Sequence, residues 1–131
     1  MALIDDKMKD NRTGVTSAGG ATGATAIFVP GGLRNVRCFA QIEIPLLTTT
    51  TATGTLTFSV YSSATSGGTY VAIGAGTTPS IAVQTAVPGP TVRIGFTPTN
   101  DDQYFKIGLS AITTLTLSTM NMNSSLVFSA P

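Results

Sequence analysis

The stretch GTLTFSVYSSATSGGTYVAI, residues 54–73, has the most regular strand pattern in the chain. Its large apolar residues Leu56, Phe58 and Val60 alternate with small polar residues, and a period of two is typical of a β-strand with one buried face. A Ser/Thr/Gly turn over residues 62–68 follows, and its glycine pair permits the positive backbone angles that tight turns need. We therefore predict a β-hairpin whose three apolar residues face a core.

Alternation also predicts a strand before the hairpin, over residues 35–44. Its apolar positions fall on one face: Val36, Cys38, Ala40, Ile42 and Ile44. We predict that Cys38 is a buried core residue, and a lone cysteine cannot form an internal disulfide. Pro45 is expected to end this strand, and the threonine-rich residues 46–53 to form a loop or a polar edge. A shorter strand is predicted at residues 25–30.

Further short strands follow the hairpin at intervals of about ten residues. They are predicted at residues 80–87, 91–97, 103–110, 112–119 and 126–128. Gly, Pro, Asn and Asp residues separate them, and no long segment shows helical periodicity. This pattern predicts an all-β protein, an antiparallel jelly-roll-like β-sandwich of about eight strands. An immunoglobulin-like sandwich is the alternative, although the Cys and Trp marks of true immunoglobulin domains are missing.

The composition limits the classes of partner. Of the 131 residues, 42% are hydrophobic and only 10% are charged, against about 25% charged in typical soluble domains. No apolar run approaches the ~20 residues of a membrane-spanning helix, so no membrane partner is expected. The net charge is +1 without a basic stripe, which argues against nucleic acid binding. Such weakly charged surfaces are common where a protein works inside an assembly.

The first residues differ from the rest of the chain. Residues 1–12 hold six of the 13 charged residues, which are 7 basic and 6 acidic in all. This segment is either a solvated tail or an arm whose Leu3, Ile4 and Met8 dock on a neighbouring molecule. Residues 13–26 are rich in Gly, Ala, Ser and Thr and are expected to form a flexible connector. We therefore expect an arm and connector at 1–26 and a β-sandwich domain at 27–131.

The expected place of synthesis follows from the same segment. Residues 1–12 are charged and lack the apolar centre of a signal peptide. We therefore expect synthesis in a host cytoplasm, without export by the general secretory route.

Catalytic chemistry is sparse in this sequence. Histidine is absent, which removes the commonest general base and the commonest metal ligand. Glu43 could serve a glycosidase only if folding brought it opposite Asp101 or Asp102. Asn100, Asp101 and Asp102 form the best polar cluster, but they supply too few ligands for calcium and are typical of a turn. We predict no enzymatic activity, no cofactor and no metal.

Aromatic residues offer one more candidate surface. Tryptophan is absent, and sugar-binding sandwiches often stack sugars on it. Phe58, Phe96, Phe105 and Phe128 alternate with the core face. The three tyrosines, Tyr61, Tyr70 and Tyr104, are candidates for the outer surface, either as interface residues or as a sugar platform.

The order of segments over residues 54–128 supports a family resemblance. An alternating strand (LTFSVY) and a Ser/Gly turn (SSATSGGTY) precede a Pro-rich turn (VPGP) and two apolar strands (TVRIGF and QYFKIGLS). This resembles the jelly-roll capsid cement, or decoration, proteins of tailed bacteriophages. Residues 1–26 match no pattern of that family.

The resemblance implies a virion protein on the outer capsid surface. It implies a homotrimer that contacts the major capsid protein and bridges capsomers without catalysis. We expect contacts from the N-terminal segment and from the loops at 62–68 and 98–102. The named contact candidates are Leu3, Ile4, Met8, Tyr61, Tyr70, Asn100, Asp101 and Asp102. The alternative function is a receptor- or glycan-binding module of a phage tail tip or fibre.

Overall fold

The computed structural model describes residues 2–3 and 9–129, and side chains over residues 9–127. These residues form ten strands. They are β1 (Ala2–Leu3), β2 (Lys9–Val15), β3 (Ile27–Phe28), β4 (Cys38–Thr50), β5 (Thr55–Ser63), β6 (Val71–Thr77), β7 (Gln84–Val87), β8 (Val92–Phe96), β9 (Tyr104–Thr113) and β10 (Thr116–Ser129). In this part of the chain no helix is long and apolar enough to cross a membrane.

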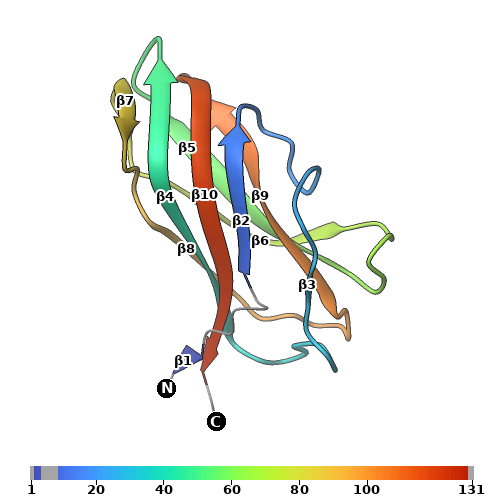
Figure 1. The fold of residues 1–131 in the computed structure, drawn as a ribbon. Helices are drawn as coiled ribbons and strands as arrows, with labels where there is room; N and C mark the ends of the chain where they lie inside the picture. Colours follow the sequence, from blue (N-terminus) through green and yellow to red (C-terminus); the bar gives the residue numbers. More distant parts are fainter. Residues whose placement is uncertain (1, 4–8, 130–131) are drawn as a thin grey trace.

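The strands lie in two antiparallel sheets that face each other (Figure 1). Sheet A has β10 and β4 at its centre, with β1 and β2 beside β10 and with β7 and β8 beside β4. Sheet B has the order β3-β9-β5-β6. Sheet A lies in front in Figure 1, and sheet B lies behind it.

The pairing identifies the sandwich as a jelly roll. When β1 and β7 are left out, the first remaining strand pairs with the last, which is β2 with β10. The second then pairs with the second last, β3 with β9, and the same order gives β4 with β8 and β5 with β6. This nesting is a long antiparallel hairpin rolled into two four-stranded layers. The predicted jelly-roll-like sandwich is thus confirmed, and the immunoglobulin-like alternative does not fit this order.

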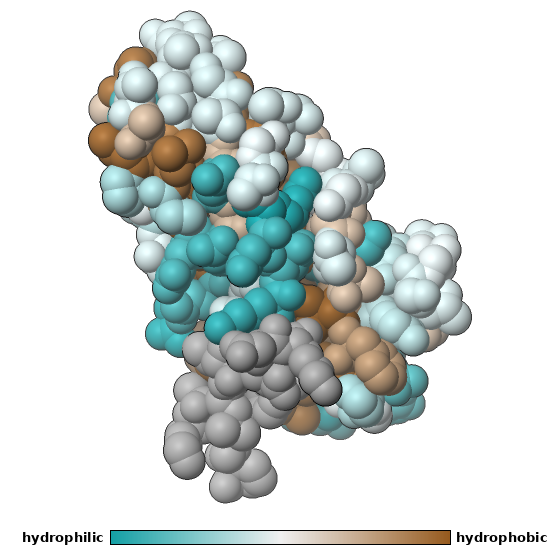
Figure 2. Space-filling view, viewed as in Figure 1, coloured by the Kyte–Doolittle hydropathy of each residue, from teal (hydrophilic) through white to brown (hydrophobic). Residues whose placement is uncertain are grey.

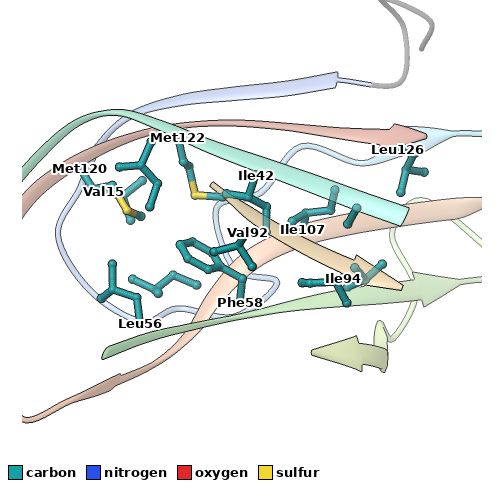
Figure 3. Packing of buried hydrophobic residues seen from close by; sticks show 14 of the residues in the cluster. Val15, Ile42, Leu56, Phe58, Val92, Ile94, Ile107, Met120, Met122 and Leu126 are labelled. Carbon is teal, nitrogen blue, oxygen red and sulfur yellow. The ribbon is translucent and has the colours of Figure 1, made fainter. Parts of the chain in front are cut away.

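The core lies between the two sheets (Figure 3). The hairpin residues Leu56, Phe58 and Val60 are fully buried there, as predicted, and Figure 3 shows Phe58 pointing toward Ile42 and Met122 of sheet A. Alternation along each strand places these side chains inward, and their burial supplies most of the driving force for folding.

Cys38 is also fully buried, as predicted. Burial raises the pKa of its thiol to about 11, because the apolar surroundings disfavour the thiolate. Its Sγ lies 3.3 Å from the backbone carbonyl of Val36. Cys38 is therefore an unreactive core residue below this pH.

The prediction that Pro45 ends a strand was wrong. β4 continues through Pro45 to Thr50. Pro45 lies beyond the β8 pairing, which ends at Ile42, and before the β7 pairing, which starts at Leu47. The ladder with β10 is also irregular at this point. A residue without an N–H is tolerated at such an irregularity, and the following threonines have high β-propensity.

Two other boundaries differ from prediction. Residues 112–119 do not form one strand, because the chain turns at Thr114, which has a φ of 72°. β10 then runs without interruption to Ser129 and includes the separately predicted strand at 126–128. The strand predicted at 80–87 is reduced to β7, preceded by a single bridge between Ile81 and Gly54.

The N-terminal region contributes more to the sheet than expected. Residues 9–15, assigned to the arm and the start of the connector, form β2 against β10. Asp10 is buried, and its carboxylate accepts a hydrogen bond from the Thr25 amide at 3.0 Å. Ser124 of β10 donates to the Asp10 carbonyl, also at 3.0 Å. These bonds tie β2 to β10 and to the segment that leads into β3.

Candidate functional site

Five side chains gather on the outer face of sheet B, and we call them the tyrosine cluster: Phe28, Tyr61, Tyr70, Tyr104 and Lys106. Phe28 of β3 is the register partner of Tyr104 of β9, and their neighbours Ile27 and Phe105 point into the core. Tyr61 of β5 is the register partner of Lys106, and Tyr70 directly precedes β6. Strand alternation therefore brings residues from four segments to one face.

The rings of the cluster contact one another or the lysine. The Phe28 and Tyr104 ring centroids are 5.0 Å apart with an interplanar angle of 31°. The Lys106 ammonium lies 4.4 Å from the Tyr70 ring centroid, a cation–π contact. Phe28 is 48% exposed, which is unusual for a large apolar side chain. The cluster therefore contains two contacting pairs on one face of the sheet, in which Phe28 is exposed and the other four side chains are partly buried.

Tyr70 is held in place by its own turn. Its hydroxyl donates a hydrogen bond of 2.8 Å to the Ser66 carbonyl in the hairpin turn. Burial raises the pKa of Tyr70, and charge repulsion from Tyr104 raises it further. The phenol is thus a neutral hydrogen-bonding group at physiological pH.

The connector supports Tyr61. The Gly20 amide donates to the Leu109 carbonyl at 2.8 Å, which fixes residues 16–24 along β9. A Cβ on Gly20 would lie 2.9 Å from the Tyr61 hydroxyl, and a Cβ on Gly108 would collide with the Gly20 carbonyl. Both glycines allow the connector to lie directly on the sheet beside the cluster.

The loop at residues 98–102 lies at the same end of sheet B. Ser62 of β5 donates a hydrogen bond of 2.8 Å to the Asp102 carboxylate. Asn100 accepts one of 3.1 Å from the Asp102 amide, as predicted for a turn stabilised by its own side chains. Arg34 contacts the Asp101 carboxylate at 3.4 Å with both side chains largely exposed. The loop is thus held by local hydrogen bonds.

The structure brings together one group of predicted contact residues and leaves another apart. Tyr61 and Tyr70 join the tyrosine cluster, and Asn100, Asp101 and Asp102 form the adjoining loop. Leu3 pairs through its backbone with Phe128 in sheet A, away from this group. Ile4 and Met8 lie outside the described residues. The contact role of all eight residues stays a prediction.

Sequence reasoning missed Phe28 and Lys106. Phe28 lies in a strand of two residues, too short for alternation to say which residue points outward. Lys106 alternates with the buried Phe105 and Ile107 and so lies on the outer face, but the sequence does not show which residue of the neighbouring strand is opposite it. The alignment of β5 with β9 would have revealed this neighbour, because it places Tyr61 directly opposite Lys106.

Glu43 does not lie opposite Asp101 or Asp102, as a glycosidase site built from these residues would require. Glu43 lies on sheet A, whereas Asp102 is hydrogen-bonded to Ser62 of sheet B. The described residues contain no group of three metal-ligating side chains.

No protein-family model matches this sequence, and no curated protein matches it. Similar structures exist among xylan-binding modules. One is a two-module fragment of Clostridium thermocellum xylanase 10B in complex with xylohexaose, in which a family 22 carbohydrate-binding module is joined to a GH10 module. It has a TM-score of 0.50 at 9% identity, and the match covers 97% of this chain and 27% of that one.

Two single modules of that type match less well. The C-terminal family 22 module of the same xylanase has a TM-score of 0.43 at 13% identity, covering 96% of this chain and 87% of that one. A xylan-binding domain of family 22 has a TM-score of 0.42 at 15% identity, covering 96% and 89%. None of the three is a capsid protein. At such low identity the likeness to the xylanase fragment concerns the fold alone, and it agrees with the jelly-roll sandwich described above.

Proposed function

We propose that this protein is a non-catalytic binding module that recognises a glycan through the tyrosine cluster. The observation that carries the proposal is the collection of all three tyrosines and the half-exposed Phe28 on one sheet face around Lys106. Exposed aromatic surface of this kind is rare on a soluble domain and marks binding sites. The proposal takes up the alternative function from the sequence analysis.

The chemistry of the cluster suits a sugar polymer. The apolar C–H faces of a sugar ring stack on aromatic rings, while hydroxyl and ammonium groups at the rim hydrogen-bond to sugar hydroxyls. Phe28 and Tyr104 provide adjacent rings, and Lys106 provides the donor. The two-module xylanase fragment that includes a sandwich of similar fold has been described in complex with xylohexaose, which makes that oligosaccharide a sensible first probe.

The test is binding of the full chain to immobilised glycans and to xylohexaose in solution, measured by titration calorimetry. We expect Tyr104→Ala to weaken binding at least tenfold, because one side chain of a stacking pair is lost. Thr113→Ala is the matched control, because this exposed residue lies at the other end of β9. Undiminished binding by Tyr61→Ala, Tyr70→Ala and Tyr104→Ala would reject the proposal.

A second candidate function is the capsid decoration role that the resemblance implies. The observation that favours it is an exposed apolar patch at β7, where Val83 is 54% and Val87 is 41% exposed (Figure 2). On a chain with few charges, such a patch is suited to contact another protein. In this proposal the protein is a homotrimer on the virion surface, made in the host cytoplasm, and its partner is the major capsid protein.

Light scattering and sedimentation with purified shells test this second candidate. We expect the mass of a trimer, co-sedimentation with the shell, and weaker sedimentation for Val83→Ser with Val87→Ser. Thr85→Ser between them is a matched control for the chemical change. A monomer that does not sediment with any shell would count against the capsid role and would leave the glycan proposal standing.

A further inference from the structure

The outer face of sheet A contains a polar depression with a volume of about 220 Å³. Seven polar residues line it: Lys9, Asn11, Gln41, Glu43, Asn123, Ser124 and Ser125. Figure 2 shows hydrophilic residues gathered over the middle of β2, β10 and β4, where the depression lies. It is on the opposite side of the sandwich from the tyrosine cluster, so neither surface is part of the other.

The ladder arranges these side chains in two rows. Asn11, Asn123 and Glu43 are register partners across β2, β10 and β4. Lys9, Ser125 and Gln41 form the next row. Neighbouring strands are about 4.8 Å apart and residues two positions apart on a strand are separated by about 6.7 Å, so hydrogen-bonding groups recur on a regular grid.

Donors and acceptors are mixed on this grid. The Gln41 amide donates a hydrogen bond of 3.2 Å to the Glu43 carboxylate. The amides of Asn11 and Asn123 can each donate and accept, and Ser125 adds a hydroxyl. Among the described lining residues there is one carboxylate, on Glu43, and one ammonium group, on Lys9, so their formal charges cancel.

We infer that the depression is a second binding site, and that its ligand is an uncharged sugar unit of a glycan. Sugar hydroxyls both donate and accept, which matches amide and carboxylate groups that alternate over a few ångströms. The depression is smaller than the ~300–1,000 Å³ pockets that enclose whole ligands. It therefore suits one sugar unit held against a sheet rather than an enclosed small molecule.

Other ligand classes fit the lining less well. Glu43 offsets the attraction that Lys9 would have for a phosphate or another anion. A divalent cation prefers several carboxylate or carbonyl oxygens, and the described residues supply one carboxylate to the lining. None of the described lining residues is aromatic, so a flat aromatic ligand would find no stacking partner among them.

This inference is independent of the function proposed for the tyrosine cluster. The two surfaces share no residue, and the core of the sandwich separates them. If both bind glycan, one copy can contact two glycan chains, and the two weak contacts reinforce each other through avidity. Each site can be removed by substitution while the other stays intact.

The experiment is a titration of the full chain followed by NMR of side-chain amide groups. The probes are xylohexaose, cellohexaose and maltohexaose, with sodium phosphate at constant pH and ionic strength as the anionic comparison. We expect at least one hexasaccharide to shift the amide signals of Asn11, Gln41 and Asn123, and phosphate to leave them unchanged. Glu43→Gln combined with Asn123→Ala should weaken this binding at least tenfold, whereas the exposed Thr50→Ala should not.

The Tyr104→Ala variant separates this inference from the proposed function. Amide shifts that persist in Tyr104→Ala support a site of its own on sheet A. Amide shifts that disappear with Tyr104→Ala, that arise equally with phosphate, or that no hexasaccharide produces would overturn the inference. Thermal unfolding of each variant checks that the fold is intact, so that a lost shift can be attributed to lost binding. We expect the fold to be intact, because the substituted Asn123 and Glu43 side chains are exposed.

Discussion

The two outer faces of the sandwich differ although the two inner faces are alike. Sheet B carries the tyrosine cluster on its outer face, whereas sheet A carries amides, a carboxylate and hydroxyls. The one phenylalanine described on the outside of sheet A, Phe39, is covered by Arg93, whose guanidinium lies 4.9 Å from the ring centroid. Phe28 on sheet B is 48% exposed. Phe39 is thus partly buried beneath a cation on one face, whereas Phe28 is exposed on the other.

This difference shows that the inward side chains of the strands stabilise the fold, whereas the outward side chains determine the character of each surface. Inward positions on both sheets hold the same kinds of side chain, because each layer must bury one apolar face against the other. Outward positions are not constrained in this way, so two unlike surfaces can share one core. Substitutions in the core should affect both faces together, whereas substitutions outside should affect one.

The largest expected effect comes from the shared core. Phe58→Ala should lower the free energy of unfolding by about 3–5 kcal/mol, because it leaves a cavity at a fully buried position between the sheets. Urea unfolding followed by circular dichroism measures the loss. The NMR signals of Tyr104 on sheet B and of Asn123 on sheet A should be lost together as the urea concentration rises. If one face unfolded well before the other, the idea of one common core would fail.

The next effect is a pH dependence from the inner face of sheet A. The folded pKa of Cys38, about 11, is above its unfolded value of 9.0, so the protonated thiol favours the folded state. This contribution is complete below pH 9 and is lost as the pH rises through 11, by up to roughly 2–3 kcal/mol. Unfolding measured at pH 8 and pH 11 should show a smaller difference in Cys38→Ala. An equal difference in both proteins would contradict the raised pKa.

A third prediction separates the faces. Gly108→Ala should destabilise the fold by about 1–3 kcal/mol, because its Cβ would collide with the Gly20 carbonyl and displace residues 16–24. Gly67→Ala is the control, because its Cβ would meet open space. NMR shifts should appear at Tyr61 and not at Asn123. Shifts of equal size on both faces would mean that the connector does not act locally.

The smallest expected effect compares the two cation–π pairs. Lys106→Met and Arg93→Met should each lower stability by about 1 kcal/mol or less, because both pairs are partly solvated. Their effects on glycan binding at the tyrosine cluster should differ. Calorimetry should find weaker binding for Lys106→Met only, and a similar loss for Arg93→Met would remove the distinction between the faces.

Much of the fold could be predicted because alternation and turns are local signals. The hairpin around Leu56, Phe58 and Val60 and the buried position of Cys38 followed directly from period two. β2 could not be found in this way, because its apolar pattern is weak and its pairing partner, β10, lies at the other end of the chain. The course of β4 through Pro45 depended on gaps in pairing that the sequence does not display.

The candidate sites were less predictable than the fold. The tyrosines could be assigned to the outer surface. Their position beside Phe28 and Lys106, however, depends on how β3 aligns with β9, β5 with β9 and β5 with β6. The polar depression joins residues of β2, β10 and β4, which are far apart in the sequence. Polar residues in alternating strands normally face solvent without forming a site, so their types alone gave no signal.

The pairing of the first long strand with the last has a consequence for synthesis on the ribosome. The hydrogen bond between Asp10 and Ser124 joins residues 114 positions apart. At about 5–20 residues per second, β2 waits on the order of 10 s for its partner to be made. During that interval its backbone is exposed in the nascent chain, where chaperones or a neighbouring copy can capture it. The polar depression can therefore form only after β10 has been made, because Asn123 and Ser125 of that strand help to line it.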